Sequence, residues 1–429
     1  MVEHLFRHEA ARIVGILTRV FGPEHLGLAE DVVQETLVRA LRTWPFHGIP
    51  ENPPGWIMRA ARNLALDVVR RQKLFREKEG EIIRRLDDTA RQGEGRETSG
   101  DRLGDDTLRL MFVCCHPEIP EDDQSALALK VLCGFGVAEI ARAFLVSEAA
   151  VAKRLTRARQ RIREAGIRFE VPEGADLAER VEGVLRTLYL LFNEGHKATE
   201  GDRLVREELC HEAIRLASLL AAHPAGNDAR VHALLALMLL NAARFPARLD
   251  DHGNLLTLAA QDRSRWDRAR MAQGFFHLAR SAQGGVMSTY HLQAGIAMCH
   301  AVAPSEEATD WGQVLALYDR LVAIDPSPVV ALNRAVAVGR VEGPEAGLRA
   351  LRQVAETGLL DSYYLLHAVQ GDFEERLGRR EAALASYRRA LGLAGPESER
   401  RFLRERCRRC EGMGDGEPEL KCGAPGEAA

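Results

Sequence analysis

The chain has 429 residues, of which 46% are hydrophobic and 28% charged, and its net charge is −4. A chain of this size can form about two to four domains with sizeable cores. It holds no run of about 18 apolar residues, and its N-terminus lacks the apolar segment of a signal peptide, so we expect a cytoplasmic protein with no membrane partner. Basic and acidic residues cluster locally, so partners have to be argued segment by segment.

Residues 1–72 predict a compact helical unit. An amphipathic helix over 4–20 ends at Phe21-Gly22-Pro23, and a second helix over 29–44 carries apolar residues at three- and four-residue spacing. These apolar residues are Val33, Leu37, Ala40, Leu41 and Trp44. A third helix starts after Pro53-Pro54 and presents Trp56 beside several arginines. An aromatic ring and cations next to a loop can bind unpaired nucleic acid; a buried tryptophan with solvated arginines is an equally good interpretation.

The stretch 73–106 is charged, polar and contains several glycines. This composition buries too little apolar surface to fold alone and predicts a flexible linker, with at most a short helix near 81–86. From Thr107 the chain is apolar again, and a helix is expected at about 122–133. This segment should support the two helices that come after it.

Residues 137–163 predict two short helices joined by a tight corner. Ser147 is a suitable N-cap for the second helix, and Val151, Leu155 and Ile162 form its inward face. The basic residues of this helix are Lys153, Arg154, Arg157, Arg159, Arg161 and Arg163. A short helix, a corner and a cationic second helix are typical of a helix-turn-helix that enters the major groove of DNA. The alternative is a solvated basic face.

Everything after Ala175 predicts helix, with helices expected over 177–193, 205–222, 229–243, 266–280, 290–301 and 311–324. Helix pairs then repeat, because Ala346 and Leu348 recur 36 positions later as Ala382 and Leu384. This spacing is close to the ~34-residue period of tetratricopeptide repeats, whose stacked pairs leave a concave face for a peptide or protein. The tail 411–429 is rich in Gly, Pro and Glu and predicts disorder.

The chain offers little for metal binding or catalysis. Cys407, Cys410 and Cys422 have metal-type spacing but lack a fourth ligand, and most other cysteines lie in apolar helical contexts. No glycine-rich phosphate loop, nucleophile elbow or HExxH motif is present. Asp262 and Asp310 fit helix caps better than catalytic acids. We therefore expect no enzyme, no metal and no cofactor.

The first unit contains two distinctive blocks: Asp31-x-x-Gln34-Glu35-Thr36-Leu37 followed by Trp44, and Pro54-x-Trp56-Ile57 followed by residues 61–71. Together they resemble region 2 of bacterial sigma factors of the extracytoplasmic-function (ECF) group of the sigma-70 family. Leu37 stands where many members carry phenylalanine, and the position stays apolar.

The resemblance implies that the first block binds the clamp of core RNA polymerase. The residues concerned are Asp31, Gln34, Glu35, Leu37 and Arg39. It also implies that the second block, with the loop 46–55, engages promoter DNA at the −10 element, where a base is captured out of the stack. The −10 residues are Trp56, Arg59, Arg62, Asn63, Asp67, Arg70 and Arg71.

With region 2 in place, the helix-turn-helix resembles region 4 of the same family. The resemblance implies that it reads the −35 element and lies at the flap of the polymerase. The −35 residues are Ser147, Glu148, Ala149, Ala150, Lys153, Arg154, Arg157, Arg159 and Arg161. Glu148, Ala149 and Lys153 are expected nearest the base edges, while Arg154, Arg157 and Arg159 mainly hold phosphates.

The extension resembles the C-terminal domain of one subgroup of these sigma factors. Blocks that carry the likeness include Gln261-Asp262-Arg263-x-x-Trp266, Thr309-Asp310-Trp311 and Tyr290-x-Leu-Gln293. In that subgroup the extension is thought to replace a separate anti-sigma factor. The resemblance therefore implies that the extension regulates the rest of the chain.

The sequence thus predicts an all-α protein. Region 2 (1–72) and region 4 (107–168) are joined by the linker 73–106 and followed by a tetratricopeptide-like solenoid (176–410) and a tail (411–429). We expect an alternative sigma factor controlled by its extension, with core polymerase and promoter DNA as partners and a candidate peptide or protein partner on the extension. The alternative is a helix-turn-helix regulator with a repeat-type sensor domain that acts without core polymerase. A pure repeat scaffold is a further rival.

Overall fold

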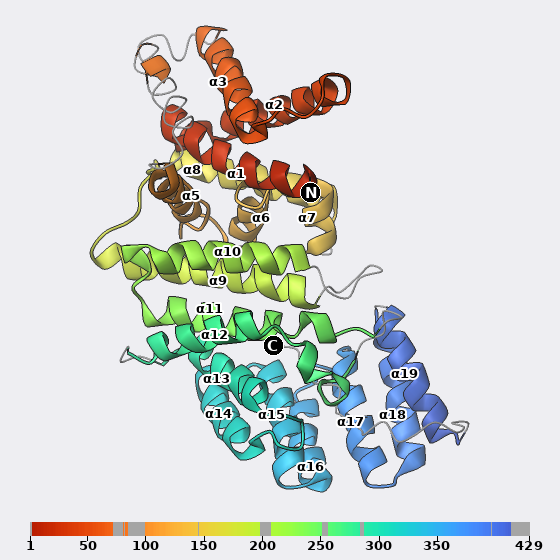
Figure 1. The fold of residues 1–429 in the computed structure, drawn as a ribbon. Coiled ribbons are helices and arrows are strands. Elements are labelled where there is room, and N and C mark those ends of the chain that lie inside the picture. Colours follow the sequence, from red (N-terminus) through yellow and green to blue (C-terminus); the bar gives the residue numbers. More distant parts are fainter. Residues whose placement is uncertain are drawn as a thin grey trace. The chain divides into compact units, whose positions relative to one another are not determined.

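The computed structural model describes residues 2–71, 80, 82–84, 99–144, 146–197, 207–250, 256–283, 287–395 and 397–412. All regular elements of this described part are helices, as the sequence predicts (Figure 1). The chain forms two compact units, Met1–Leu191 and Phe192–Ala429. Each unit buries a set of apolar side chains of its own.

The first unit begins with three helices, α1 (Val2–Phe21), α2 (Leu26–His47) and α3 (Pro53–Arg71), and a 3₁₀ turn η1 (Pro23–His25) precedes α2. α1 packs on α2 and α3. Ile13, Ile16 and Leu17 of α1 are at most 2% exposed. Because they recur at three- and four-residue spacing, they form one buried stripe along the helix. The expected three-helix unit is confirmed.

The second helix is longer than expected. It starts at Leu26 and continues past Trp44 to His47, with Pro45 inside its last turns. The helix tolerates this proline because only one N–H is lost, and the Gly48 N–H still donates to the Trp44 carbonyl oxygen at 2.9 Å. Leu41, expected on the apolar face, is 60% exposed. The prediction for Leu41 was therefore wrong.

Helix α5 (Ser99–Cys114) corrects the end of the expected linker. Residues 99–106 are helical, and α5 packs on α1. Asp106 is 1% exposed, and its carboxylate pairs with Arg19 of α1 at 3.2 Å and with Arg109 at 3.1 Å. The ion pair between Asp106 and Arg19 joins α5 to a helix far away in the sequence, and composition cannot reveal such a contact. Ile82–Arg84 are also helical, and the other residues of 72–98 except Gly80 lie outside the described part.

The helix-turn-helix is present as predicted. It consists of α7 (Val137–Ala143) and α8 (Glu148–Glu164), and both pack on α6 (Glu121–Val131). The Ser147 hydroxyl oxygen accepts a hydrogen bond from the Ala150 N–H at 3.2 Å, which confirms the N-cap. Val151, Leu155 and Ile162 are at most 2% exposed. This leaves the remaining faces of α8 polar.

Helix α9 (Ala175–Lys197) begins within the first unit, which extends to Leu191. The Arg180 guanidinium donates to the Phe112 carbonyl oxygen at 2.7 Å, and Arg186 pairs with Glu121. A Cβ atom at Gly183 would lie 2.9 Å from the Cys115 carbonyl oxygen. The apolar residues Val181, Val184, Leu185 and Leu188 are buried. The start of the expected extension therefore covers the support of the helix-turn-helix.

The second unit stacks helices in chain order. They are α10 (Glu207–Ala222), α11 (Ala229–Ala242), α12 (Arg268–Ser281), α13 (Thr289–Val302), α14 (Trp311–Ile324), α15 (Pro328–Val341), α16 (Pro344–Ala355), α17 (Tyr364–Arg376), α18 (Arg380–Leu393) and α19 (Glu397–Cys410). From α10 to α19 each helix packs on the next one along the chain (Figure 1). Paired helices are thus confirmed, and the tetratricopeptide character stays a prediction.

Polar residues cap several of these helices, as expected. The Asp310 carboxylate accepts from the Gln313 N–H at 2.9 Å, and the Asp262 carboxylate accepts from the Ser264 N–H at 2.9 Å. The helix expected from Trp266 begins instead at Arg268. Trp266 precedes it, is 3% exposed and lies 4.9 Å from the Arg263 guanidinium. A buried ring stacked on a cation takes the place of the first helical turn.

Glycines allow the closest helix approaches in the second unit. A Cβ atom at Gly347 would lie 2.6 Å from the Phe373 ring, and one at Gly371 would lie 2.8 Å from the Tyr387 ring. A Cβ atom at Gly339 would overlap the Phe373 ring as well. Both rings are fully buried. Small residues opposite aromatic rings therefore fix the spacing of α15 to α18.

Candidate nucleic-acid and protein interfaces

The outer face of α2 carries most of the residues predicted to bind protein. Asp31, Gln34, Glu35 and Arg39 are exposed, and Leu37 is half-buried. The Arg39 guanidinium donates to the Glu35 carboxylate at 3.2 Å, which aligns both side chains along the helix.

Two apolar residues on this face were not among the interface residues predicted from the sequence. Val38 is 37% exposed and Leu41 is 60% exposed. They lie one turn and two turns after Gln34, so they share a face with the predicted polar residues. An apolar centre with a polar rim is the usual anatomy of a protein interface. The signal in the sequence was an apolar pattern too wide for one buried stripe.

The end of α2 and the loop that follows it expose further apolar side chains. Phe46 is 85% exposed and Ile49 is 61% exposed. Trp56 behaves differently, because it is half-buried and meets the buried ring of Trp44 edge-on at a centroid distance of 5.6 Å. The interpretation of Trp56 as a packed ring is therefore confirmed in part, and the binding of unpaired nucleic acid by its exposed part stays a prediction.

Helix α3 presents its polar residues along one side. Arg59, Asn63, Asp67, Arg70 and Arg71 are exposed, and their spacing follows the helical repeat. Arg62 is half-buried, and its guanidinium donates to the Asn63 side-chain oxygen at 3.4 Å. The predicted −10 residues thus form a single surface.

On α8 the predicted residues divide into two groups. Ser147, Glu148, Ala149, Lys153 and Arg161 are exposed, and Ala150 is half-buried. The other group consists of arginines that reach acids of other helices. Arg154 pairs with Asp122 at 3.0 Å.

The pair between Arg157 and Asp123 involves a buried acid. Arg157 donates twice, from Nε at 2.9 Å and from Nη2 at 2.7 Å, and Asp123 is fully buried. Hydrogen bonding to this carboxylate raises the pKa of the Arg157 guanidinium. Arg157 therefore stabilises the attachment of α8 to α6, beyond the phosphate contact predicted for it.

Arg159 reaches a different helix altogether. Its Nε and Nη2 atoms donate to the Oε2 atom of Glu30 in α2 at 3.0 and 2.8 Å. Glu30 is 5% exposed, and burial raises the pKa of its carboxyl group even though Arg159 opposes the shift. Sequence reasoning missed this pair. The signal was present, because Glu30 falls on the buried stripe of Leu26 and Val33, where a charge needs a partner.

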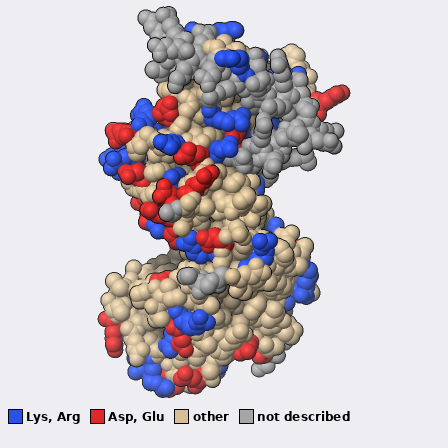
Figure 2. All heavy atoms as spheres, turned by 90° about the vertical axis from the view of Figure 1, so that its left-hand side faces the viewer, with Lys and Arg blue, Asp and Glu red and all other residues tan. Residues whose placement is uncertain are grey.

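Charges on the visible face of the molecule are mixed. Figure 2 shows Lys and Arg side chains interleaved with Asp and Glu side chains, with no large field of one sign. This distribution agrees with the small net charge of −4. Candidate DNA contacts therefore depend on individual helices.

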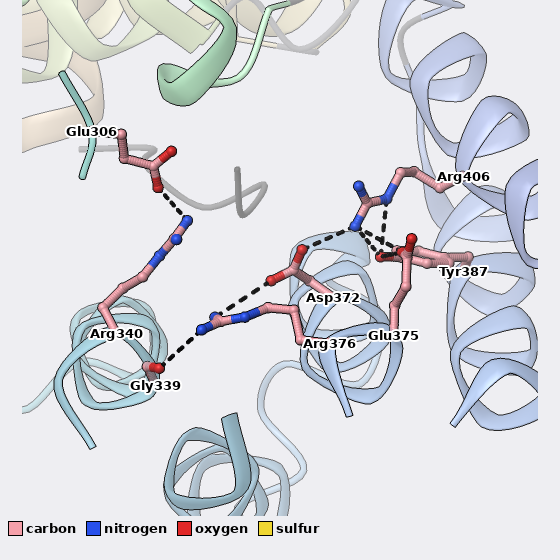
Figure 3. Close-up of polar contacts among 8 residues, drawn as sticks. All are labelled: Glu306, Gly339, Arg340, Asp372, Glu375, Arg376, Tyr387 and Arg406. Carbon is pink, nitrogen blue, oxygen red and sulfur yellow. Dashed lines mark hydrogen bonds and ion pairs between the residues drawn. The ribbon is translucent and has the colours of Figure 1, made fainter. Parts of the chain in front are cut away.

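The second unit holds a buried network of charges that the sequence analysis did not anticipate (Figure 3). Arg406 of α19 is 4% exposed and pairs with Asp372 and Glu375 of α17, each at 2.9 Å. Arg406 also donates to the Tyr387 hydroxyl oxygen at 2.7 Å. Burial raises the pKa of Asp372.

The same figure shows two further arginines of this unit (Figure 3). Arg376 lies 4.0 Å from the Asp372 carboxylate and donates to the Gly339 carbonyl oxygen, and Arg340 pairs with Glu306. A further arginine, Arg409, lies 3.9 Å from the Glu375 carboxylate. The network therefore ties α15, α17, α18 and α19 together.

The described part of the chain offers no group of three or more His, Cys, Asp or Glu side chains that could hold a metal ion. Cys407 and Cys410 lie on α19, and Cys407 packs in the apolar cluster of α18 and α19. None of the described helices is both long and apolar enough to cross a membrane.

Three segments of the chain match known protein families. Residues 5–75 match sigma-70 region 2, and residues 109–162 match sigma-70 region 4. Residues 180–282 match a family of unknown function (DUF6596). The chain is 41% identical over 395 residues to an uncharacterised protein of Rhizobium meliloti (strain 1021), and the match covers 91% of each chain. No solved structure matches it significantly.

Proposed function

The chain belongs to the sigma-70 family of RNA polymerase sigma factors, as an ECF-type member with a helical C-terminal extension. On this basis we propose which of its surfaces bind core polymerase and which bind promoter DNA. A sigma factor binds core RNA polymerase and directs it to promoter DNA, so the predicted function and both partners are consequences of the two sigma regions. The family is not enzymatic. Separate helices of the two regions make the contacts with polymerase and with DNA.

The outer face of α2 binds the clamp of core polymerase. Asp31, Gln34, Glu35, Leu37 and Arg39 supply polar contacts and the edge of the interface. Val38 and Leu41 supply its apolar centre, because their exposed side chains gain free energy when the clamp removes them from water. The exposure of Leu41 is the observation that carries this assignment.

The surface of α3 and the preceding loop binds the −10 element. Arg59, Arg62, Arg70 and Arg71 approach phosphates, while Asn63 can hydrogen-bond a base edge. Phe46, at 85% exposure, is a better stacking platform for an unpaired base than the half-buried Trp56. Asp67 contributes to the shape of this surface and repels phosphate beside it.

Helix α8 reads the −35 element, and region 4 lies at the flap of the polymerase. Ser147, Glu148, Ala149 and Ala150 occupy its N-terminal end, where a recognition helix contacts base edges. Lys153 and Arg161 are exposed cations that do not reach an acid of another helix, so Lys153, expected near the base edges, is also free to contact phosphate. Arg154 and Arg157 contribute to DNA binding beside their acidic partners on α6, whereas Arg159 is paired with Glu30 of α2.

The helical extension regulates these activities and acts as a tetratricopeptide-like surface for a protein or peptide. Its consecutive helix pairs and their glycine–aromatic contacts support this proposal. The protein works in the cytoplasm, where core polymerase and promoter DNA are found.

In vitro transcription with bacterial core polymerase tests the assignment of α2. The substitution Leu41→Asp should abolish core binding and promoter-directed transcripts without unfolding the protein, because Leu41 is already 60% exposed. Leu359→Asp is a matched control, since Leu359 is 70% exposed in the second unit. Equal core affinity of the wild type and Leu41→Asp would refute the apolar centre.

A further inference from the structure

We infer that Glu30 and Arg159 form a latch that holds α8 against α2 in the free sigma factor and has to open before α8 can engage promoter DNA. The inference rests on the proposed −35 role of α8. It adds a competition between an acid of region 2 and DNA for the same guanidinium group.

The contact joins residues 129 positions apart in the chain. Two N–H groups of Arg159 converge on one oxygen of Glu30, at 3.0 and 2.8 Å. A Cβ atom at Gly27 would lie 3.7 Å from the Arg159 side chain, and α8 also packs on η1. Lys130 of α6 adds a second positive charge near Glu30. Region 4 therefore approaches region 2 with cations that converge on one buried acid.

Glu30 and a DNA phosphate compete for the same donors. The guanidinium group recognises both carboxylate and phosphate oxygens through paired N–H groups. While Nε and Nη2 of Arg159 bind Glu30, they cannot bind phosphate. Arg154 and Arg157 differ, because Asp122 and Asp123 lie on α6 within region 4. Their ion pairs can persist when region 4 moves as a body, whereas the Glu30 pair cannot.

The chemistry of the contact suits a reversible latch. Glu30 Oε1 has no hydrogen-bond partner among the described residues, so one oxygen of a buried carboxylate stays uncompensated. Desolvation of the buried Glu30 carboxylate offsets part of the attraction. A leucine at position 30 would extend the stripe of Leu26 and Val33 and favour a permanent core. A carboxylate instead is hydrated again when α8 moves away, so opening the contact costs little free energy.

The test measures the separation of α2 and α8 in the full-length protein without polymerase. Non-natural amino acids that carry spin labels replace the exposed residues His47 and Glu164. Pulsed electron paramagnetic resonance then measures the distance between the two labels. Glu30→Gln keeps the size of the side chain and removes its charge. We expect the distance distribution to shift to larger values. The variant Asp122→Asn is the matched control, because it frees Arg154 inside region 4 and should leave the distribution unchanged.

DNA binding gives the second measurement, with a short mixed-sequence duplex at low salt as the probe. Glu30→Gln should bind roughly fivefold tighter than the wild type, in line with the loss of one competing ion pair. The exchange Glu30→Arg with Arg159→Glu should restore the short distance. An unchanged distance in Glu30→Gln would overturn the latch. A longer distance without tighter DNA binding would overturn the competition. If Lys153→Ala bound DNA as the wild type does, the −35 assignment would fail independently.

Discussion

The cations of α8 make different kinds of contact. Lys153 has no ion pair with a described acid, and Arg161 lies 3.8 Å from Glu164 on the surface. Arg157, in contrast, holds the fully buried carboxylate of Asp123. Removing a cation that holds no buried acid takes away a phosphate contact alone. Removing Arg157 also leaves a buried acid without its cation, which destabilises the fold.

The substitution Lys153→Ala should therefore weaken DNA binding and leave stability unchanged. We expect the slope of log affinity against log salt to fall by about 0.9 for the lost phosphate contact. Arg157→Ala should lower both DNA affinity and the melting temperature. Binding isotherms at several salt concentrations, combined with thermal denaturation, separate the two effects. Equal melting temperatures for both variants would show that Asp123 does not need Arg157.

Among elements, the spacing of α15 to α18 depends on glycines that face aromatic rings. Gly339 and Gly347 meet Phe373, and Gly371 meets Tyr387. Gly339 lies on α15 and Gly371 on α17, the first helices of two consecutive pairs, and the two glycines are 32 residues apart. Gly339 faces the first helix of the next pair and Gly371 the second helix of its own pair, so both kinds of helix contact depend on a small residue.

Gly371→Ala should destabilise the second unit by roughly 1–3 kcal/mol, because its methyl group would lie 2.8 Å from the buried Tyr387 ring. Gly392→Ala on α18 is the control, since nothing lies within 4 Å of its added Cβ atom. This control should gain up to about 1 kcal/mol from helix propensity. Urea denaturation of both variants measures the difference. A stabilised Gly371→Ala would mean that α17 and α18 can separate freely.

The contact between α11 and α12 includes two stacked imidazole rings. The Nδ1 atoms of His232 and His277 lie 2.9 Å apart, so one ring has to donate and the other accept. Burial, followed by the charges of His232 and Arg280, lowers the pKa of His277 from 6.5 to about 4. Burial also lowers the pKa of His232.

This pair makes the stability of the second unit sensitive to acid. His277 binds a proton near pH 6.5 in the unfolded chain but only near pH 4 in the folded protein. Its contribution to the free energy of unfolding is therefore fully present above pH 6.5 and is lost as the pH falls toward 4. Melting temperatures across this range should fall less steeply for His277→Gln than for the wild type. His47→Gln, at an exposed position, is the control. Parallel curves for all three proteins would exclude a contribution from the pair.

At the scale of the whole molecule, the boundary between the sigma regions and the extension does not lie at the end of region 4. The first part of α9 buries Val181, Val184, Leu185 and Leu188 within the first unit. Each such side chain contributes on the order of 2 kcal/mol when fully buried. A chain cut before α9 loses this contribution and exposes the apolar support of the helix-turn-helix.

Truncation after Gly166 should therefore give a protein that aggregates or melts at a lower temperature, whereas truncation after Lys197 should keep region 4 folded. Both fragments should retain core binding through α2. Comparing them in transcription assays separates the structural role of α9 from regulation by the rest of the extension. If the two fragments were equally stable, α9 would not be part of the first unit. Unchanged transcription from the longer fragment would show that the rest of the extension is dispensable.

The sequence by itself determined the local features of this protein. Helical spacing, the Ser147 cap, the Asp310 cap and the two sigma blocks all depend on residues within a few turns of one another. Such patterns act through neighbouring positions, and a single chain displays them directly.

Only the tertiary structure decided the contacts between distant residues. The pairs of Glu30 with Arg159 and of Asp106 with Arg19 join separate helices, and the burial of Arg406 depends on α17 and α18. The exposure of Leu41 likewise depends on which face of α2 remains uncovered by α1 and α3. A charge or a leucine looks the same in the sequence whether it faces water or another helix. Packing chooses between these environments, and the free energy of desolvation then decides what each residue does.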